Sequence, residues 1–311
     1  MLRFSLQCFL LLFFFPASGA EEFVFNGFTT ANISFEGEAS VDERGRLGLT
    51  TGLDTGVVGH AFYKYPVSLR NLRDHGVSSF TTSFVFEITS LYGDSFERGM
   101  GTNGFAFVVS STNKFLNDSL PGQYLGLPNV SNRDNTSINI LAIEVDAVTR
   151  LVGIYVNSLT SINSHTAGYY NTTSEDGFKL WRRLDNGALQ LWVEYDGNVQ
   201  QLNVTLGAPG SSKPKYPLLS SHANLSYLLS SEVFIGFSAS TSTVADRNFI
   251  LGWSFKKDGE APQLNYSAFI EGFYFEYVKE FCLVCYFKAS KVPVPPTETA
   301  LLKLHCTLSL L

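Results

Sequence analysis

Residues 189–206 read LQLWVEYDGNVQQLNVTL, two segments in which apolar and polar residues alternate. Alternate side chains of an extended strand point to opposite faces, so the apolar residues of each segment share one face. Between the segments, Asp196-Gly197 favours the positive φ angles of a two-residue hairpin turn. The stretch therefore predicts an antiparallel hairpin with one buried face, and Asn203 lies on its polar face.

Similar short runs occur along most of the chain. A helical period is nearly absent between residues 21 and 257, whereas alternating or wholly apolar runs are frequent. Beyond the hairpin, we expect strands at 80–88, 104–109, 138–145, 152–156, 232–237 and 249–255. Many short strands without intervening helices are typical of a β-sandwich, so the expected fold class is all-β.

Composition limits the functions open to this chain. Of 311 residues, 45% are hydrophobic, which is too many for a disordered protein. The 22 Lys and Arg are outnumbered by 28 Asp and Glu. A protein that binds nucleic acid needs a basic surface to replace the counterions of the phosphates, so this balance argues against that class.

The first twenty residues have the character of a secretory signal peptide. Arg3 is followed by an apolar run at 9–15, and Ser18-Gly19-Ala20 supplies small residues at the cleavage position. The apolar run is shorter than the roughly 20 residues of a membrane span. We therefore expect a secreted, extracellular protein, with plasma-membrane association as the alternative.

We expect one β-sandwich domain over residues 21–267 and a divergent tail over 268–311. The tail contains Cys282, Cys285 and Cys306, an odd number that leaves at least one thiol unpaired within the chain. Its aromatic stretch carries four acidic or basic residues, which makes it a poor transmembrane span. No transmembrane span is therefore expected.

Eight Asn-x-Ser/Thr sites accompany the signal peptide, and none has Pro in the middle. They predict a glycoprotein with glycosylated surface loops and strand faces. The acceptors are Asn32, Asn117, Asn129, Asn135, Asn171, Asn203, Asn224 and Asn265.

The pair Glu144 and Asp146 is the strongest candidate for a functional site. At i and i+2 of a strand, two carboxylates point to one face and repel unless a cation or a proton intervenes. A solvated strand face is the alternative. The apolar residues around the pair, including Ile143 and Val145, favour a site because they indicate a largely buried strand.

In combination, several segments resemble the legume-type lectin domain, and above all the extracellular L-type lectin domains of plant receptor kinases. The resemblance covers roughly residues 22–267 and implies a concanavalin-like sandwich that binds a glycan or glycoprotein and, in many relatives, forms a homodimer. No kinase motif is found. The segments that carry the resemblance are FTTSFVF (80–86), NGFAFV (103–108), QYLGL (123–127), AIEVD (142–146), VGI (152–154), VNS (156–158) and ILGWSF (250–255).

The resemblance also implies a calcium and a manganese-like ion beside the sugar site. Glu144 and Asp146 match the first two ligands and Val148 matches a carbonyl ligand. Arg150 stands in place of an Asn and Leu151 in place of a His, and about ten residues that would carry another Asp are missing. Calcium prefers six to eight oxygen ligands. We therefore expect no bound metal, with Arg150 available to neutralise the carboxylates.

The family's sugar contacts have also changed. An Asp is replaced by Asn, which can still accept a hydrogen bond, and the stacking aromatic is replaced by Val148. Ordinary loop residues in a lectin-derived domain are the alternative at each position. The corresponding residues are Asn103, Gly122, Gln123, Arg150, Thr243 and Val244.

These observations predict a non-enzymatic carbohydrate-binding domain with weakened or metal-independent binding. The first alternative is an extracellular interaction module that no longer binds sugar. The second is a glycoside hydrolase of similar fold, but Thr149 occupies the position of the closing Glu. A glycine-rich match at 99–104 leads into a strand, which excludes a nucleotide site. Cys282 and Cys285 lack the context of a redox or zinc pair.

Overall fold

A computed structural model describes residues 22–52, 54–70, 76–90, 104–128, 139–158, 160–170, 177–181, 187–226, 232–243 and 245–268. Several predictions lie outside the described residues. They concern the signal peptide, the tail beyond residue 268, the sugar contacts Asn103 and Val244, and the glycan acceptors Asn129, Asn135 and Asn171.

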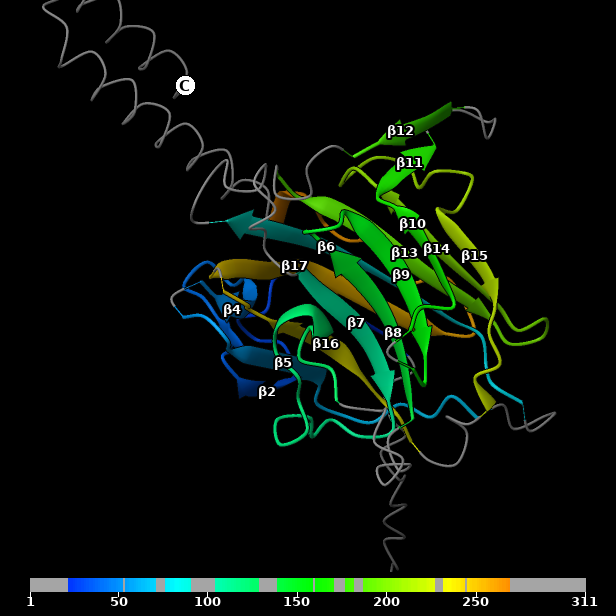
Figure 1. The fold of residues 1–311 in the computed structure, drawn as a ribbon. Helices are drawn as coiled ribbons and strands as arrows, with labels where there is room; N and C mark the ends of the chain where they lie inside the picture. Colours follow the sequence, from blue (N-terminus) through cyan, green and yellow to red (C-terminus); the bar gives the residue numbers. More distant parts are fainter. Residues whose placement is uncertain are drawn as a thin grey trace, which may run out of the picture.

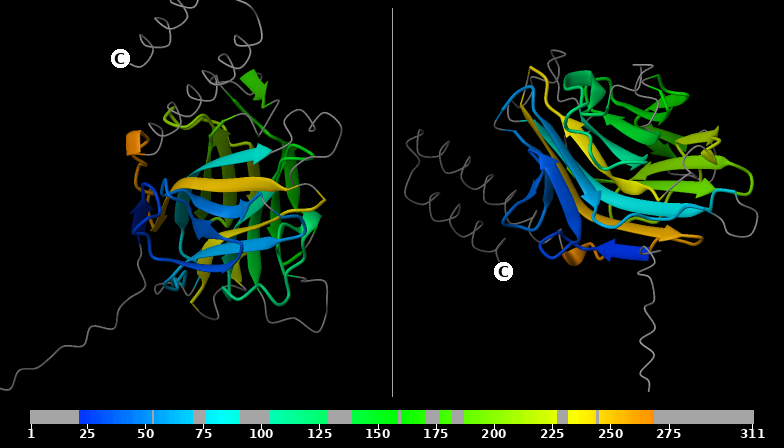
Figure 2. Two further views of the ribbon diagram at one scale, coloured as in Figure 1. Left: turned by 90° about the vertical axis from the view of Figure 1, so that its left-hand side faces the viewer. Right: turned by 90° about the horizontal axis from the view of Figure 1, so that it is seen from below.

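Two large antiparallel sheets form two stacked layers (Figures 1 and 2). The eight-stranded sheet contains, in spatial order, β15 (Leu219–His222), β14 (Gln201–Gly207), β13 (Leu189–Asp196), β6 (Phe80–Ser90), β17 (Asp246–Lys257), β4 (Leu47–Thr51) and β3 (Ser40–Val41), with β1 (Glu22–Phe25) paired to β17.

The seven-stranded sheet contains β10 (Asn163–Thr166), β9 (Leu151–Val156), β8 (Ile140–Asp146), β7 (Gly104–Ser110), β16 (Phe234–Ser240), β5 (Val58–Tyr63) and β2 (Ile33–Gly37). A small two-stranded sheet joins β11 (Gly168–Tyr170) to β12 (Phe178–Leu180). Every strand expected from the sequence is present in one of the two large sheets. The all-β sandwich is confirmed.

Aromatic side chains fill the space between the layers. Phe84 on β6 meets Phe237 on β16 edge to face, with ring centroids 5.1 Å apart, and Phe237 meets Trp253 on β17 at 4.8 Å. Phe105 and Phe107 on β7 contact the same group. Because these rings come from both sheets and are fully buried, the two layers share one hydrophobic core.

The hairpin of β13 and β14 is confirmed, but the expected two-residue turn is wrong. The strands pair as far as Asp196 and Gln201, so residues 197–200 form a four-residue turn whose positive φ, 54°, falls on Gln200. Gly197 is required for a different reason. A Cβ atom there would lie 1.8 Å from the carbonyl oxygen of Val77, so only glycine permits this approach of the two backbones.

The outer face of each large sheet is partly covered, by different segments. On the seven-stranded sheet, Ala106, Val108 and Ala142 pack under Phe115 and Leu125 of the segment that follows β7. On the eight-stranded sheet, the chain leaving β17 turns back over the sheet and buries Leu264 there. Within the described residues, no helix is long and apolar enough to cross a membrane.

Candidate functional site

Glu144 and Asp146 lie on the outer face of β8, where both are half-buried. They continue the row begun by Ile140 and Ala142, which are buried in the outer apolar cluster. The sequence-based expectation of two carboxylates on one face of a largely buried strand is therefore correct.

Glu144 is hydrogen bonded to Tyr155, a residue that the sequence analysis did not identify. Gly153 of β9 lies opposite Glu144, and because it has no side chain the ring of Tyr155 lies over it. The hydroxyl of Tyr155 donates to Oε2 of Glu144. Burial raises the pKa of Glu144 to about 7, the charge of Asp146 adds to the rise, and the bond from Tyr155 opposes it. A proton on Glu144 therefore relieves part of the repulsion at neutral pH.

Asp146 uses both carboxylate oxygens within its own turn. Oδ1 accepts from the amides of Val148 at 2.7 Å and Thr149 at 3.0 Å, and Oδ2 accepts from the Thr149 hydroxyl at 2.7 Å. This capping closes the short turn between β8 and β9. The carboxylate that the resemblance implies as a metal ligand thus serves as the cap of a tight turn.

Arg150 completes this turn with a left-handed backbone, φ 59°, and its carbonyl accepts from the amide of Ala167 at 2.8 Å. Leu151 begins β9 directly opposite Asp146. Neutralisation of the carboxylates by Arg150 stays a prediction. Within the described ranges, no group of three or more His, Cys, Asp or Glu residues is arranged to hold a metal ion. A turn in which Asp146 caps the backbone and Leu151 takes the expected His position does not fit the two-metal site that the resemblance implies, and the absence of a bound metal stays a prediction.

Strand register brings three loops together at one end of the seven-stranded sheet. Asp146 pairs with Gly104 in β7, and Ala239 of β16 pairs with Phe105, so Ser240 follows beside Gly104. Neighbouring strands lie about 4.8 Å apart, and β7 lies between β8 and β16. The backbones of Asp146 and Ser240 are therefore about 10 Å apart. We use the name loop end for the region formed by Asp146 and the β8–β9 turn, Ser240, Gly122–Tyr124 and Thr243.

Side chains of the underlying strands β5 and β16 hold the short helix η2 (Gly122–Tyr124) in place. Three buried donors from β5 and β16 bind three carbonyl oxygens of its loop. They are Ser240 Oγ to Gly122 (2.9 Å), Ser238 Oγ to Leu125 (2.7 Å) and His60 Nε2 to Gly126 (2.9 Å). A carbonyl oxygen can only accept, so Nε2 of His60 carries a proton toward it, and burial lowers the pKa of this ring. The loop is therefore ordered by the protein's own donors.

Three of the predicted sugar contacts, Gly122, Gln123 and Thr243, lie in adjoining loops. Gly122 faces Ser242, whose Oγ would lie 3.6 Å from a Cβ at Gly122, so the η2 loop adjoins the loop that carries Thr243. Gln123 and Thr243 are both exposed. Arg150 lies in the neighbouring β8–β9 turn and is exposed too.

Buried polar residues beneath the loop end are the main features that sequence reasoning missed. Asp246 is fully buried at the start of β17, and burial raises its pKa to about 7, against hydrogen bonds from Asn248 and the Gly104 amide. Ser238 and Ser240 alternate along an otherwise apolar strand. These polar residues at alternate positions of a buried strand were the sequence signal that could have revealed the support of the loop, since buried polar groups need hydrogen-bond partners.

Glycan acceptors among the described residues lie at the surface. Asn32, Asn117, Asn224 and Asn265 are exposed. Asn203 is half-buried on the outer face of β14, where its Oδ1 accepts from the hydroxyl of Ser220 at 2.6 Å. Their glycosylation stays a prediction.

Comparison with known sequences finds the legume lectin domain over residues 20–269. The L-type lectin-domain containing receptor kinase SIT2 of Oryza sativa subsp. japonica is 38% identical over 264 residues, which cover 81% of this chain and 38% of that protein. The L-type lectin-domain containing receptor kinase V.9 of Arabidopsis thaliana is 38% identical over 256 residues, covering 79% and 36%. The chain thus spans well under half the length of these curated relatives.

Two solved structures show the same fold. The Lotus tetragonolobus seed lectin (isoform) superposes with a TM-score of 0.59 at 24% identity, covering 78% of this chain and 99% of that one. Lectin II from Ulex europaeus gives a TM-score of 0.60 at 22% identity, covering 78% and 100%.

Proposed function

Because the chain belongs to the legume lectin domain family, we propose that it binds carbohydrate at the loop end without bound metal ions. Gln123 and Thr243 are the exposed side chains that would contact the sugar, beside the η2 loop and the turn that contains Arg150. Hydroxyl, amide and guanidinium groups suit the dense hydrogen-bonding groups of a saccharide.

The single observation that supports metal independence is the capping role of Asp146. Its two oxygens already accept three hydrogen bonds from the β8–β9 turn, at 2.7 to 3.0 Å. A calcium ion needs six to eight oxygen ligands and would have to compete with these donors. In place of a metal, Ser240, Ser238 and His60 hold the η2 loop from below.

We propose further that this domain acts outside the cell as a non-enzymatic recognition module. Receptor kinases are the matched relatives, and the chain aligns with only part of their length. Its partners are then glycans or glycoproteins. A homodimer, expected from the family resemblance, belongs to the same proposal and is testable by analytical ultracentrifugation.

The test is glycan-array binding of the full chain with and without EDTA, together with metal analysis of the purified protein. We expect binding that EDTA leaves unchanged and far less than one calcium per chain. Gln123→Ala should weaken binding, since it removes an exposed donor and acceptor at the loop end. Gln201→Ala is the matched control, because that amide bonds Ser220 on the opposite sheet.

Three results would contradict the proposal. Loss of binding in EDTA, with about one calcium per chain in its absence, would identify a conventional metal-dependent lectin. Failure to bind any glycan would favour an interaction module. Release of reducing sugar would indicate a glycoside hydrolase.

A further inference from the structure

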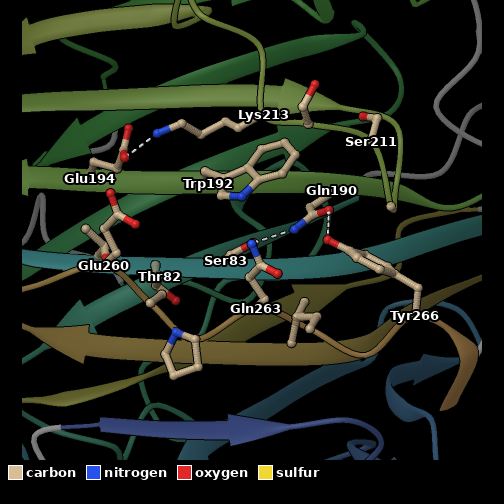
Figure 3. Close-up of a pocket in the computed structure, with 16 residues that line it drawn as sticks. Thr82, Ser83, Gln190, Trp192, Glu194, Ser211, Lys213, Glu260, Gln263 and Tyr266 are labelled. Carbon is tan, nitrogen blue, oxygen red and sulfur yellow. Dashed lines mark hydrogen bonds and ion pairs between the residues drawn. The ribbon is translucent and has the colours of Figure 1, made fainter.

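A cavity of about 400 Å³ opens on the outer face of the eight-stranded sheet, on the opposite sheet from the loop end (Figure 3). Its floor is formed by β6 and β13, one wall by residues 210–213 and the other by residues 260–266. We call it the outer cavity. Its volume is within the range of sites that hold small ligands.

The floor is built by strand alternation. Gln190, Trp192 and Glu194 occupy alternate positions of β13, so all three face outward, while Leu191 and Val193 between them are buried in the core. Ser83 of β6 pairs with Trp192 and faces the same way. The sequence of the β13–β14 hairpin already contains a signal for this floor, because its polar face includes one large aromatic side chain, Trp192.

Trp192 provides a flat apolar surface. The ring lies beside Gly207 of β14, where a Cβ atom would come within 3.2 Å of both the indole and the ring of Pro214. The absence of a side chain at Gly207 thus makes room for the indole. Trp192 is only half-buried and lines the cavity, so part of the ring can contact a ligand.

Gln190 provides a fixed amide next to the indole. It is 2% exposed, its Nε2 donates to Ser83 Oγ at 2.7 Å, and its Oε1 accepts from the Tyr266 hydroxyl at 2.7 Å (Figure 3). An amide has two N–H groups and two lone pairs, so each end keeps capacity for a second hydrogen bond. Because its orientation is already determined, little side-chain entropy is lost on binding.

The wall that carries Tyr266 is also anchored. Thr81 Oγ1 donates to the carbonyl of Gly259 at 2.7 Å, and the amide of Asn265 donates to Asn26 Oδ1 at 2.7 Å. Leu264, between these anchors, packs into an apolar cluster on the sheet. The cavity is therefore bounded by held segments rather than by loose loops.

The charges disfavour an anionic ligand. Glu194 and Glu260 line the cavity, and among its described lining residues Lys213 is the one cation. Lys213 forms an ion pair with Glu194, which leaves one carboxylate in excess. Phosphates and other anions would meet a net negative site, whereas carboxylate and amide oxygens accept hydrogen bonds from hydroxyl groups.

We infer that the outer cavity is a second saccharide site, separate from the loop end. A neutral pyranose has an apolar C–H face for the Trp192 ring and hydroxyl groups for Gln190, Ser83 and Glu260. The inference uses none of the residues proposed to bind sugar at the loop end, so each site can fail without the other.

The saccharide has two sources. One is a free glycan or the glycan of another protein. The other is a glycan attached to Asn203, since Asn203 pairs directly with Glu194 and so lies next to the cavity on the same face. Both supply the same chemistry, and removal of the Asn203 acceptor distinguishes them.

The test follows the indole N–H signal of Trp192 by ¹H–¹⁵N NMR during titration of the glycosylated full chain. The signal is assigned by its loss in Trp192→Phe, and those of Trp181 and Trp253, outside the cavity lining, serve as internal controls. The probes are methyl α-mannopyranoside, methyl β-galactopyranoside and N-acetylglucosamine, compared with adenine and inorganic phosphate. Wild type and Asn203→Gln are titrated in parallel.

We expect at least one sugar to shift the Trp192 signal and leave the two control signals in place. Ser211 lies at an exposed position on the cavity wall, so the larger side chain in Ser211→Tyr should fill the cavity. We expect this variant to bind the sugar about tenfold more weakly or worse, because a few central contacts supply most of the binding energy. A response in both proteins indicates a free glycan. A response only in Asn203→Gln indicates that the chain's own glycan fills the cavity.

The inference is overturned if no sugar moves the Trp192 signal in either protein, or if only adenine or phosphate does. It is equally overturned if Ser211→Tyr leaves the sugar affinity unchanged while the Trp253 signal shows a native core. Failure at the loop end, measured with Gln123→Ala, has no bearing on this signal.

Discussion

The outer faces of the two sheets are covered in different ways. On the seven-stranded sheet, the segment after β7 covers an apolar cluster around Phe115, and polar groups such as Asp146 lie at the loop end. On the eight-stranded sheet, two crossing segments stand apart and leave the outer cavity between them, with Trp192 on its floor. The two proposed binding regions thus differ in construction and share one core.

The two regions also differ in how the sequence encodes them. One part of the loop end lies on consecutive positions of β8 and its turn, from Glu144 to Arg150, so a linear motif marks that part. The outer cavity combines side chains from four separate segments. A motif search finds the first kind of site, and only packing finds the second.

The largest expected effect comes from the core that both regions share. Phe237→Ala removes a fully buried ring that contacts Phe84, Phe105 and Trp253, and should lower the free energy of unfolding by about 3–5 kcal/mol. Urea denaturation followed by circular dichroism measures this loss. Phe35→Ala, at an exposed phenylalanine, should change stability by only about 0.5 kcal/mol. Equal losses in the two variants would show that the sheets do not share a core.

A pH-dependent effect is expected beneath the loop end. The pKa of Asp246 rises to about 7 in the folded protein from an ordinary 3.8, so its favourable contribution is present at low pH and is lost as pH rises through 7. Between pH 4 and pH 8 this group should cost about 2–4 kcal/mol of stability. Asp246→Asn should reduce that slope in denaturation measured at both pH values, and the contribution of Glu144, whose pKa also rises to about 7, should remain.

The exposed Asp118→Asn is the control for this pH dependence and should leave the slope intact. A steeper decline with pH in Asp246→Asn than in the wild type would show the assigned sign to be wrong.

A smaller effect should separate the two regions. Ser240→Ala removes the donor to the Gly122 carbonyl, at a cost of about 1 kcal/mol in stability. It should weaken glycan binding at the loop end, because the η2 loop loses a support, and leave the Trp192 response unchanged. Ser34→Ala is a matched control, since this β2 hydroxyl donates to the Phe62 carbonyl at 3.3 Å on the same sheet. Unchanged array binding in Ser240→Ala would argue that η2 does not form the site.

The smallest effect is expected at the rim of the outer cavity. Lys213→Ala breaks an ion pair with Glu194 that is open to solvent, and should cost less than about 1 kcal/mol. Salt screens such pairs, so the difference in Tm between variant and wild type should shrink at high ionic strength. A loss that persists in high salt would indicate that Lys213 supports the cavity through packing instead.

Alternation in the sequence was sufficient to predict the sandwich, because a strand with one buried face must place apolar residues at every second position. The same rule placed Glu144 and Asp146 on one face of β8 and Asn203 on the polar face of β14. The hairpin turn could not be predicted in the same way. Its form depends on the contact of Gly197 with the Val77 backbone, about 120 residues earlier.

Tertiary structure alone decided how the polar groups pair. Tyr155 reaches Glu144 across Gly153 because two strands align in register, and Ser240 reaches Gly122 because a distant loop folds back over β16. The outer cavity likewise exists only where residues 210–213 and 260–266 flank β6 and β13. Local sequence determines which face of a strand a side chain occupies, whereas its partner across space follows from the packing of the whole chain.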